Sequence, residues 1–237
     1  MELKDMITRR KSTRSFTGVP VTEPTLEKIR AFLPRLQPLY PEIGVQAEIV
    51  SREQVRCFLP WVTPQLLAIY TEDAPGAAEN AGFLFQQMDL YLHSLGLGTC
   101  WLGMGRMSGR IPAPKGMRFL ILMAFGWPKE GFRTDVSQFR RKALAEIADR
   151  EDPRLEPARL APSSVNSQPW YFVHEGEVIH AFCGGKGLFG KTLGEMNRID
   201  MGIALAHLYV SYPGFRFFKV ETPPEVKGCT YLGSLTL

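Results

Sequence analysis

The stretch Glu79–Leu95, ENAGFLFQQMDLYLHSL, is long, largely apolar and free of proline. Such a stretch predicts an α-helix that is buried over much of its surface. A second stretch of the same character is Leu193–Tyr212, LGEMNRIDMGIALAHLYVSY. The strings NAGFLFQQMDLY and IDMGIALAHLYV within them are similar, and they place Gly82 and Gly202 in register at an offset of 120 residues. This similarity predicts a weak internal repeat of about half the chain.

The composition is that of an ordinary globular protein. The 237 residues are 45% hydrophobic, which is enough for one large domain or two small ones. No apolar run reaches the roughly 18 residues that a membrane span needs, and the start MELKDMITRRK lacks the apolar core of a secretory signal. We therefore expect a cytoplasmic protein with no membrane partner. The net charge of +4 comes without a long basic block, so no nucleic-acid partner is indicated.

Shorter helices and strands are predicted around the two long helices. A short helix is expected over Glu2–Arg10, and a helix capped by Thr22 over Glu23–Leu36. Met117–Phe125 is apolar on both faces, which predicts a strand in the centre of a sheet. Asp149–Arg159 contains two prolines and is interpreted as a linker or an interrupted helix that joins two halves. Other predicted strands are Val45–Val50, Leu66–Tyr70, the hairpin of Trp170–His174 and Glu177–Phe182, Phe215–Glu221 and Thr230–Leu237.

A basic segment near the N-terminus is a candidate phosphate site. RRKSTRSF, Arg9–Phe16, follows the first predicted helix. If the chain is extended from Arg10, the side chains of Arg10, Ser12 and Arg14 alternate along it and point to one side. Two guanidinium groups and a hydroxyl would then bind a terminal phosphate, with each charge-assisted hydrogen bond worth about 1.5–3 kcal/mol. The alternative is a solvated basic helix end.

A second basic run lies in FRRKALAEI, Phe139–Ile147, where a helix is predicted. Arg140, Arg141 and Lys142 stand at the start of this helix. One of them could join the phosphate site, and a solvated helix start is the alternative.

The stretch Leu160–Phe172, LAPSSVNSQPWYF, reads as a specific loop ahead of an aromatic strand. Pro162 and Pro169 prevent a continuous helix, and the serine, asparagine and glutamine side chains offer hydroxyls and amides without charge. A flat heterocycle with carbonyl and imide groups needs such partners, and the following aromatic residues offer apolar cover. The alternative is an ordinary turn before a strand.

Glycine recurs in Gly96–Gly105, GLGTCWLGMG, which predicts a turn whose backbone approaches a ligand closely. The pattern is not the dinucleotide fingerprint G-x-G-x-x-G, because Trp101 stands where the third glycine belongs. A cysteine nucleophile elbow would need glycine in place of Leu102. Cys100 is therefore expected to be a packed thiol.

Gly185–Thr192, GKGLFGKT, matches the phosphate-loop pattern G-x-x-x-x-G-K-[ST] between a strand and a helix. A nucleotide hydrolase with this loop builds a parallel sheet after it and needs an aspartate at the end of an apolar strand to hold magnesium. Only 45 residues follow Thr192, and the strands predicted there do not end in that way. A nucleotide hydrolase is kept as an alternative, and a surface loop is the simpler interpretation.

Neither the cysteines nor the histidines predict a metal site. The four cysteines include no C-x-x-C pair, so neither a zinc site nor a disulfide framework is indicated. The four histidines show no metal spacing and no Ser–His–Asp arrangement.

Taken together, RRKSTRSF, GLGTCWLG and APSSVNSQPWYF resemble the FMN-dependent nitroreductase family. In common members of that family the serine- and asparagine-containing loop comes early, and two identical chains share each flavin. Here the loop lies in the second half, and nearly the whole chain resembles the subgroup in which two half-units are fused into a pseudo-dimer. The resemblance implies an α+β fold, with sheets flanked by long buried helices. It implies one domain over residues 1–237, with half-units at about 1–148 and 153–237.

The resemblance also implies the position of an FMN site. None of the three segments occurs a second time in the chain, which predicts one FMN site per chain and a vestigial pseudo-symmetric site. The implied residues bind the flavin phosphate, border its reactive N5 edge, or cover the flavin from the other half-unit. They are Arg10, Ser12, Arg14 and Arg141 for the phosphate, Leu102, Gly103 and Met104 at the N5 edge, and Pro162, Ser163, Ser164 and Asn166 in the covering loop.

The activity implied is hydride transfer from NAD(P)H through the flavin to an electron-poor acceptor, such as a nitroaromatic or a quinone. No catalytic side chain beyond those that bind FMN is expected. A flavin-binding protein without turnover, for storage or sensing, is the alternative from a different class. Pro60–Pro64 and Lys186–Lys191 are expected to shape the acceptor pocket. A small-molecule acceptor is the expected partner, and a chain that already mimics a dimer is expected to be a monomer.

Overall fold

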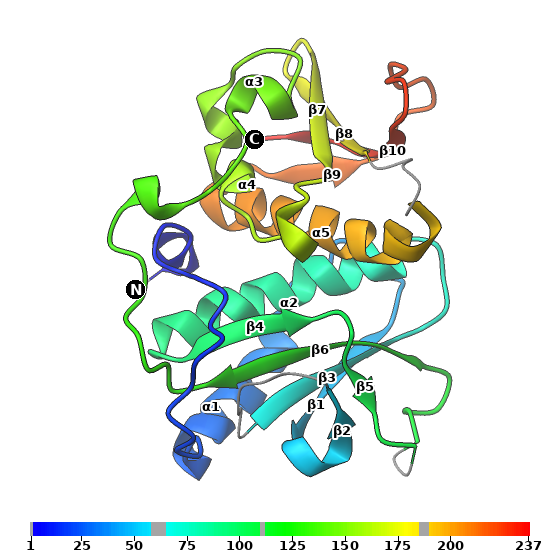
Figure 1. Ribbon diagram of the computed structural model, residues 1–237. Coiled ribbons are helices and arrows are strands. Elements are labelled where there is room, and N and C mark those ends of the chain that lie inside the picture. Colours follow the sequence, from blue (N-terminus) through cyan, green and yellow to red (C-terminus); the bar gives the residue numbers. More distant parts are fainter. Residues whose placement is uncertain (1, 58–64, 110–111, 185–189) are drawn as a thin grey trace.

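Figure 1 shows the computed structural model, in which two long helices lie between two β-sheets. The structure describes residues 2–57, 65–109, 112–184 and 190–237. The α-helices are α1 (Glu23–Phe32), α2 (Ala77–Ser94), α3 (Leu144–Ile147), α4 (Glu156–Arg159) and α5 (Gly190–Ser211). The strands are β1 (Val45–Ser51), β2 (Val55–Arg56), β3 (Gln65–Thr71), β4 (Gly98–Leu102), β5 (Arg106–Met107), β6 (Arg118–Gly126), β7 (Trp170–Glu175), β8 (Val178–Cys183), β9 (Arg216–Phe218) and β10 (Thr230–Thr236). Short 3₁₀ turns are η1 (Leu3–Met6), η2 (Leu33–Arg35), η3 (Arg52–Gln54), η4 (Val136–Gln138), η5 (Pro153–Leu155) and η6 (Ser164–Asn166).

The two four-stranded sheets share one connectivity. The first has the strand order β1-β3-β6-β4 and the second has the order β7-β8-β10-β9, with antiparallel neighbours in both. In each unit the long helix follows the second strand of the sheet, so α2 connects β3 to β4 and α5 connects β8 to β9. The similarity of the two helices thus extends to the strands around them. The half-unit boundaries near residues 148 and 153 stay a prediction.

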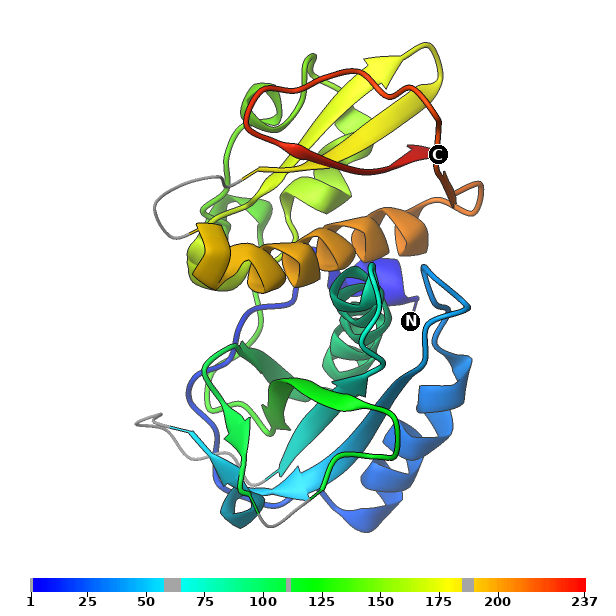
Figure 2. The same cartoon turned by 90° about the vertical axis from the view of Figure 1, so that its right-hand side faces the viewer.

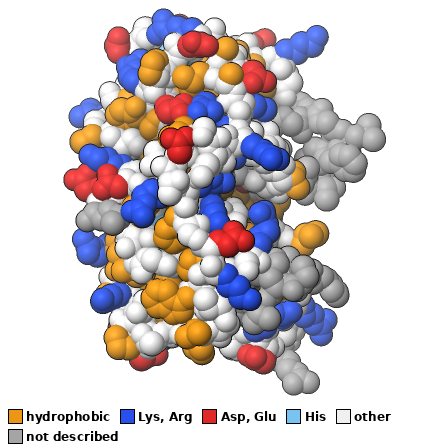
Figure 3. Space-filling view, turned by 60° about the vertical axis from the view of Figure 1, so that its left-hand side comes forward, with side chains coloured by type: hydrophobic (Ala, Val, Ile, Leu, Met, Phe, Trp, Pro, Cys, Tyr) orange, Lys and Arg blue, Asp and Glu red, His pale blue; other side chains and the backbone are white. Residues whose placement is uncertain are grey.

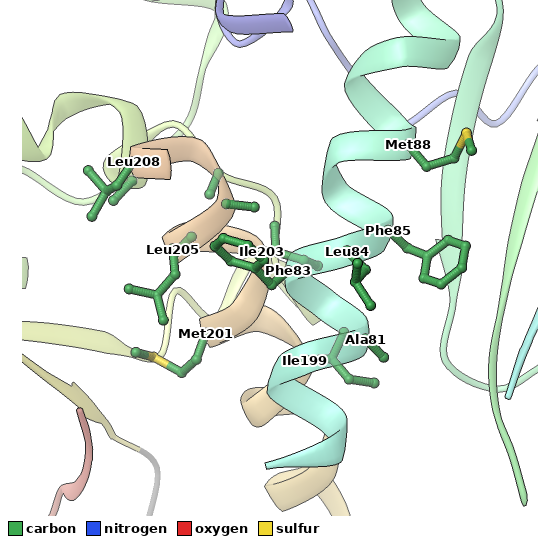
Figure 4. Close-up of a cluster of buried hydrophobic side chains, with 14 of the residues drawn as sticks. Ala81, Phe83, Leu84, Phe85, Met88, Ile199, Met201, Ile203, Leu205 and Leu208 are labelled. Atoms are coloured by element: carbon green, nitrogen blue, oxygen red, sulfur yellow. The ribbon is translucent and has the colours of Figure 1, made fainter. Parts of the chain in front are cut away.

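The two long helices cross where each carries a glycine. A Cβ at Gly82 would lie 2.2 Å from the carbonyl oxygen of Ile199, and one at Gly202 would lie 2.0 Å from that of Glu79. Only glycine lets two helix backbones approach this closely. Figure 2, in which α2 is seen almost end-on, shows the crossing between the two sheets. Figure 4 labels ten buried apolar side chains around it: Ala81, Phe83, Leu84, Phe85, Met88, Ile199, Met201, Ile203, Leu205 and Leu208.

The structure confirms the two long helices, the α+β class and most predicted strands. α2 and α5 begin two and three residues earlier than predicted, and each ends one residue earlier. β6 lies between β3 and β4, as its apolar faces predicted, and β7 pairs with β8 in the predicted hairpin. None of the described helices is long and apolar enough to cross a membrane.

Two predicted elements in the middle of the chain are wrong. Gly96–Gly105, predicted as a turn, contains β4, because Gly98–Leu102 pairs with β6. The helix predicted over Phe139–Ile147 is limited to the single turn α3. Residues 140–142 precede that turn without regular structure, so the second basic run does not begin a helix.

The N-terminal helices are shorter than predicted. Only η1 forms within Glu2–Arg10. α1 ends at Phe32, because a 3₁₀ turn that contains Pro34 follows it. Thr22 occupies the N-cap position of α1, but its side chain makes no capping hydrogen bond.

Candidate functional site

The basic N-terminal segment runs alongside β4. Thr13 donates its backbone N–H to the carbonyl oxygen of Thr99 at 2.7 Å, and Ser12 forms a parallel bridge to the same residue. Thr13 is buried, and its side chain occupies the space that a Cβ at Gly98 would need. Because side chains alternate along an extended chain, Ser12 and Arg14 lie on the opposite side from Thr13. There Ser12 is half-buried and Arg14 is exposed.

Arg10 is buried and reaches a carboxylate on α2. Its Nε donates to Oδ2 of Asp89 at 2.9 Å, and both side chains are 1% exposed or less. Asp89 also accepts hydrogen bonds from the hydroxyl of Thr99 and the amide of Gln86. Burial alone would raise the pKa of Asp89, but the Arg10 charge and the Thr99 hydrogen bond contribute to lowering it overall. Asp89 is therefore a charged carboxylate that holds one edge of the Arg10 guanidinium.

The other edge of the Arg10 guanidinium has a donor without a partner. Its Nη2 is buried and forms no hydrogen bond with any described residue. A buried donor without an acceptor costs about 1–3 kcal/mol, and more when the group is charged. Arg10 thus offers an unused, charged donor to an anion.

Two further arginines lie close enough to Arg10 to respond to its charge. Burial and the Arg10 guanidinium lower the pKa of Arg133 to about 10, and burial, Arg10 and Arg133 lower that of Arg141 to about 10. The guanidinium carbons of Arg133 and Arg141 lie 4.1 and 5.5 Å from the ring centroid of Phe139. We call Arg10, Arg133 and Arg141 the arginine cluster.

The arginine cluster carries more positive charge than its neighbouring carboxylate neutralises. Asp89 pairs with Arg10, and the other two guanidinium groups add two positive charges. Figure 3 brings the side with the N-terminal and 127–143 segments forward, and it shows Lys and Arg side chains along the middle of this face. Planar guanidinium groups bind phosphate and carboxylate through paired hydrogen bonds. The cluster is therefore suited to an anion of about two charges.

Arg141 also fixes the loop of residues 160–169. Its Nε donates to the carbonyl oxygen of Ala161 at 2.9 Å, and its Nη1 donates to Oδ1 of Asn166 at 2.8 Å. Val165 and Asn166 both have a left-handed backbone, with φ of 45° and 57°. A β-branched residue such as Val165 rarely adopts this conformation, so the contacts around it must stabilise the loop. The structure thus joins the second basic run and the loop at one place.

Three more residues of the loop are held by local contacts and by α5. Pro162 is buried, and the hydroxyl of Ser163 accepts a hydrogen bond from the N–H of Gln168 at 2.9 Å. The N–H of Ser164 donates to both carboxylate oxygens of Asp200, at 3.1 and 3.0 Å. Burial raises the pKa of Asp200 to about 7, although the hydrogen bond from Ser164 acts in the opposite direction.

Asp200 is expected to make stability depend on pH. Its pKa is about 7 in the folded chain and near 3.9 in an unfolded one, so the folded chain binds the proton more tightly. The contribution of Asp200 to the free energy of unfolding is complete below about pH 4 and is lost as the pH rises to about 7. At 1.36 kcal/mol per pKa unit, the loss is at most about 4 kcal/mol. We expect Asp200→Asn to remove it, as measured by urea unfolding at about pH 5 and about pH 8.

The comparison between the two proteins isolates Asp200 from other titrating groups. Buried His207, whose pKa burial lowers to about 3, changes stability in the opposite direction below its usual pKa, but it does so in both proteins. A loss of stability between the two pH values that is the same with and without Asp200 would show that its carboxyl group is already ionised at the lower pH.

The backbone that follows β4 lies beside α5. A Cβ at Gly103 would lie 2.8 Å from Sδ of Met196 on α5. The Gly103 carbonyl accepts a hydrogen bond from Nη1 of Arg106 at 3.0 Å. Met104 is 85% exposed, and Val165 in the 160–169 loop is 84% exposed. Both segments were predicted to contact a ligand, and each exposes an apolar side chain. Such side chains are expected in the wall of a site that a bound ligand covers.

The structure brings several of the sequence-predicted residues together. Arg10 and Arg141 share the arginine cluster, and Asn166 is bonded to Arg141. The side chain of Leu102 is 6% exposed and packs in the core, while the role of its backbone beside a flavin stays a prediction. Cys100 is buried, which confirms the prediction of a packed thiol. Burial raises the pKa of this thiol, and the positive charge of Arg14 acts in the opposite direction.

Three residues of the site escaped prediction from sequence. Asp89 and Asp200 lie within the long apolar helices, and Arg133 lies alone in a loop. Asp89 carried the clearest signal, because a charged residue in a buried helix needs a partner of opposite charge. Arg133 carried no signal, because nothing in the sequence around it marks its contact with the carbonyl oxygen of Arg10.

The rival sites considered from sequence gain no support within the described residues. No group of three or more potential metal ligands occurs among them. Residues 185–189 of the phosphate-loop pattern lie outside the described residues, as do residues 60–64 and 186–189 of the expected acceptor pocket. The ladders of both described four-stranded sheets are antiparallel, whereas a phosphate-loop hydrolase needs a parallel sheet.

The chain is similar to solved nitroreductases. A structure from Thermotoga maritima described as a "putative nitroreductase" has a TM-score of 0.67 and 20% identity, and the match covers 99% of this chain and 92% of that one. A nitroreductase family protein from Clostridium difficile 630 has a TM-score of 0.49 and 13% identity, with coverage of 62% and 96%. An FMN-dependent nitroreductase from Clostridium difficile R20291 has a TM-score of 0.44 and 17% identity, with coverage of 58% and 98%. No curated protein matches the chain.

Sequence identities of 13–20% to these structures show a shared fold and no more. Family membership is shown instead by a match to a family model. The Thermotoga structure shares that fold along almost the whole chain. A family model described as "Putative TM nitroreductase" matches residues 2–212. The chain therefore belongs to the nitroreductase family of oxidoreductases.

Proposed function

We propose that this chain binds FMN and passes hydride from NAD(P)H to an electron-poor small molecule of the nitroaromatic or quinone type. The observation that carries the proposal is the arginine cluster, in which Nη2 of Arg10 is buried without a partner. A phosphate group would supply the acceptor that this donor lacks. Family membership supports flavin chemistry in general, and the cluster supports a flavin that carries a phosphate.

The residues around the cluster fit the remainder of FMN. The 160–169 loop, fixed by Arg141, would cover the ring with neutral polar groups, including the amide of Asn166. Gly103 would let the backbone approach the ring, because it has no side chain and the atoms beside it belong to the flexible end of Met196. Bound flavin would supply the hydride and electron transfer. The protein would position the ring and exclude water with exposed apolar groups such as Met104.

Arg141→Met is expected to weaken FMN binding by about 10-fold to 100-fold and riboflavin binding by a factor at least about 5 times smaller, because the lost loop contacts affect both ligands whereas the lost phosphate contact affects FMN alone. Riboflavin has the same ring but no phosphate, so the contrast separates loss of the anion site from disruption of the loop. Titration followed by flavin fluorescence measures both affinities. Anaerobic addition of NADH or NADPH to the FMN-loaded protein is expected to bleach the flavin absorbance.

Arg140→Met is the matched control, because Arg140 is the adjacent arginine and is exposed. We expect its affinity for FMN to stay within about 2-fold of the original. Equal weakening by both variants, or equal effects on FMN and riboflavin, would contradict the phosphate site. Bound FMN that neither NADH nor NADPH reduces would favour a storage or sensing protein. A protein that takes up no flavin but hydrolyses ATP would favour the phosphate-loop alternative.

A further inference from the structure

A cavity lies between the two half-units, at the N-terminal end of α2. It has a volume of about 500 Å³. The segment before β1 forms one wall, and the strands β9 and β10 form the other. Figure 2 shows these two parts facing each other, with the segment before β1 in light blue and the segment leading to β9 in orange. The residues used below are Tyr40, Glu42, Glu79, Arg198, Phe217 and Lys219, all of which line the cavity.

This cavity occupies the pseudo-symmetric position to the proposed flavin site. The shared strand order places β9 in the second sheet where β4 stands in the first. The segment before β1 likewise corresponds to the 160–169 loop, which precedes β7. Asn80 accepts the N–H groups of Leu39 and Tyr40 at 2.8 and 2.9 Å, just as Asp200, 120 residues later, accepts the N–H of Ser164. The two polar residues therefore anchor equivalent loops on the two crossing helices.

The charges of this cavity differ from those of the arginine cluster. Its walls carry Glu42 and Glu79 against Arg198 and Lys219, so the formal charges cancel. Arg198 donates to Oε1 of Glu79 at 2.5 Å, and Nζ of Lys219 donates to the carbonyl oxygen of Leu232. Both cations are thus engaged within the protein. A flavin phosphate would therefore meet no net positive charge here, unlike at the arginine cluster.

One carboxylate oxygen of Glu79 accepts no hydrogen bond from the described residues. The residue is 2% exposed, and its Oε2 is buried without a partner among the described residues. A buried carboxylate oxygen is stabilised by a donor, and most strongly by a charged one. The Gln86–Asp89 contact elsewhere on α2 shows the same helix satisfying another buried carboxylate with an N–H donor.

The remaining walls are aromatic. The rings of Tyr40 and Phe217 meet edge to face with centroids 5.8 Å apart. Burial raises the pKa of Tyr40, so its hydroxyl is neutral at physiological pH. Aromatic walls beside a buried carboxylate oxygen that Arg198 leaves without a partner are suited to a flat ring that carries an amine donor.

We infer that the cavity at the N-terminal end of α2 is a second ligand site, which takes a small aromatic amine. The amine donates to Oε2 of Glu79, and the ring packs against Tyr40 and Phe217. The pseudo-symmetric position is therefore a binding site of different chemistry rather than a vestige of the flavin site. This inference does not depend on the identity of the cofactor bound at the arginine cluster.

Tryptamine is the probe, and its binding is measured by isothermal titration calorimetry on the purified protein, both with and without added FMN. Glu79→Gln replaces the unpaired acceptor with an N–H donor while keeping the size of the side chain and an oxygen for Arg198. We expect this change to weaken tryptamine binding at least 10-fold. Indole-3-acetate has the same ring with a carboxylate in place of the amine, and we expect it to bind the original protein at least 10-fold more weakly than tryptamine does.

Glu42→Gln is the control variant, because it makes the same chemical change at an exposed residue of the same cavity. Its affinity for tryptamine should stay within about 2-fold of the original. If Glu79→Gln does not fold, Phe217→Leu removes an aromatic wall and should weaken tryptamine binding instead. Three results would overturn the inference. The original protein does not bind tryptamine, or it binds tryptamine no more tightly than indole-3-acetate. Alternatively, Glu79→Gln or Phe217→Leu binds tryptamine as tightly as the original protein does. Uptake of a second FMN that Glu79→Gln abolishes would also overturn it.

Discussion

Gly202→Ala is expected to lower the free energy of unfolding by about 3 kcal/mol or more, because the added methyl group has no space at the helix crossing. A Cβ at residue 202 would lie 2.0 Å from the carbonyl oxygen of Glu79 and 2.7 Å from the backbone nitrogen of Phe83. Both atoms belong to the backbone of α2, so no rotamer change relieves the overlap and the helices must separate. At roughly 2–4 °C per kcal/mol, the melting temperature should fall by about 6–12 °C.

Gly194→Ala is the control for this prediction, because Gly194 lies in the same helix and a Cβ there would meet no atom within 4 Å. Alanine in a helix is favoured over glycine, so we expect this variant to gain about 0.5–1 kcal/mol. Gly82→Ala should resemble Gly202→Ala, since its Cβ would lie 2.2 Å from the carbonyl oxygen of Ile199. Thermal unfolding of the three variants side by side provides the measurement. A Gly202→Ala protein as stable as the original would mean that the helices do not cross in contact at this point.

The elements that sequence predicts well are those whose own residues decide their structure. α2 and α5 are long and free of proline, and their apolar surface leaves burial as the stable arrangement. The same holds for β6, where Met123 and Ala124 point to opposite faces and both are fully buried. The sequence also shows Gly82 and Gly202 in register. It does not show that the two glycines face each other, because that depends on how the helices cross.

The elements that sequence predicts poorly depend on distant partners. β4 begins at a glycine, which is unfavourable in a strand, yet Gly98 is needed because Thr13 occupies the space beside it. Arg141 and Lys142 were expected to begin a helix. Instead Arg141 bonds to the carbonyl oxygen of Ala161, and the N–H of Lys142 donates to the side chain of Gln168. These contacts to the 160–169 loop hold the basic run in a non-helical conformation.

The residues of the candidate site likewise divide into those that local sequence marks and those that only the fold brings together. Arg10, Arg141 and Asn166 stood in short patterns whose residue types already indicated an anion and a neutral heterocycle. Asp89 and Arg133 became visible only when the fold placed them beside Arg10. Local sequence therefore marks the candidate ligand-binding groups, which stay a prediction, while the residues that set their charge and orientation come from other elements.

Arg10→Met is expected to cost about 3–5 kcal/mol of unfolding free energy, because it leaves the carboxylate of Asp89 buried without its cation. The two side chains are 1% and 0% exposed, so water cannot replace the lost partner. Arg14→Met provides the control for stability. Arg14 is exposed, and its replacement should change the free energy of unfolding by no more than about 0.5 kcal/mol. Equilibrium unfolding in urea measures both changes.

The double variant Arg10→Met/Asp89→Asn separates the two roles assigned to Arg10. Asparagine removes the unpaired negative charge and keeps an oxygen for the Thr99 hydroxyl, so we expect at least half of the lost stability to return. Binding of FMN should not return with it, because the donor at Nη2 of Arg10 is still missing. A double variant that is both stable and able to bind FMN with the original affinity would show that Arg10 only neutralises Asp89. In that case the phosphate would depend on Arg133 and Arg141 alone.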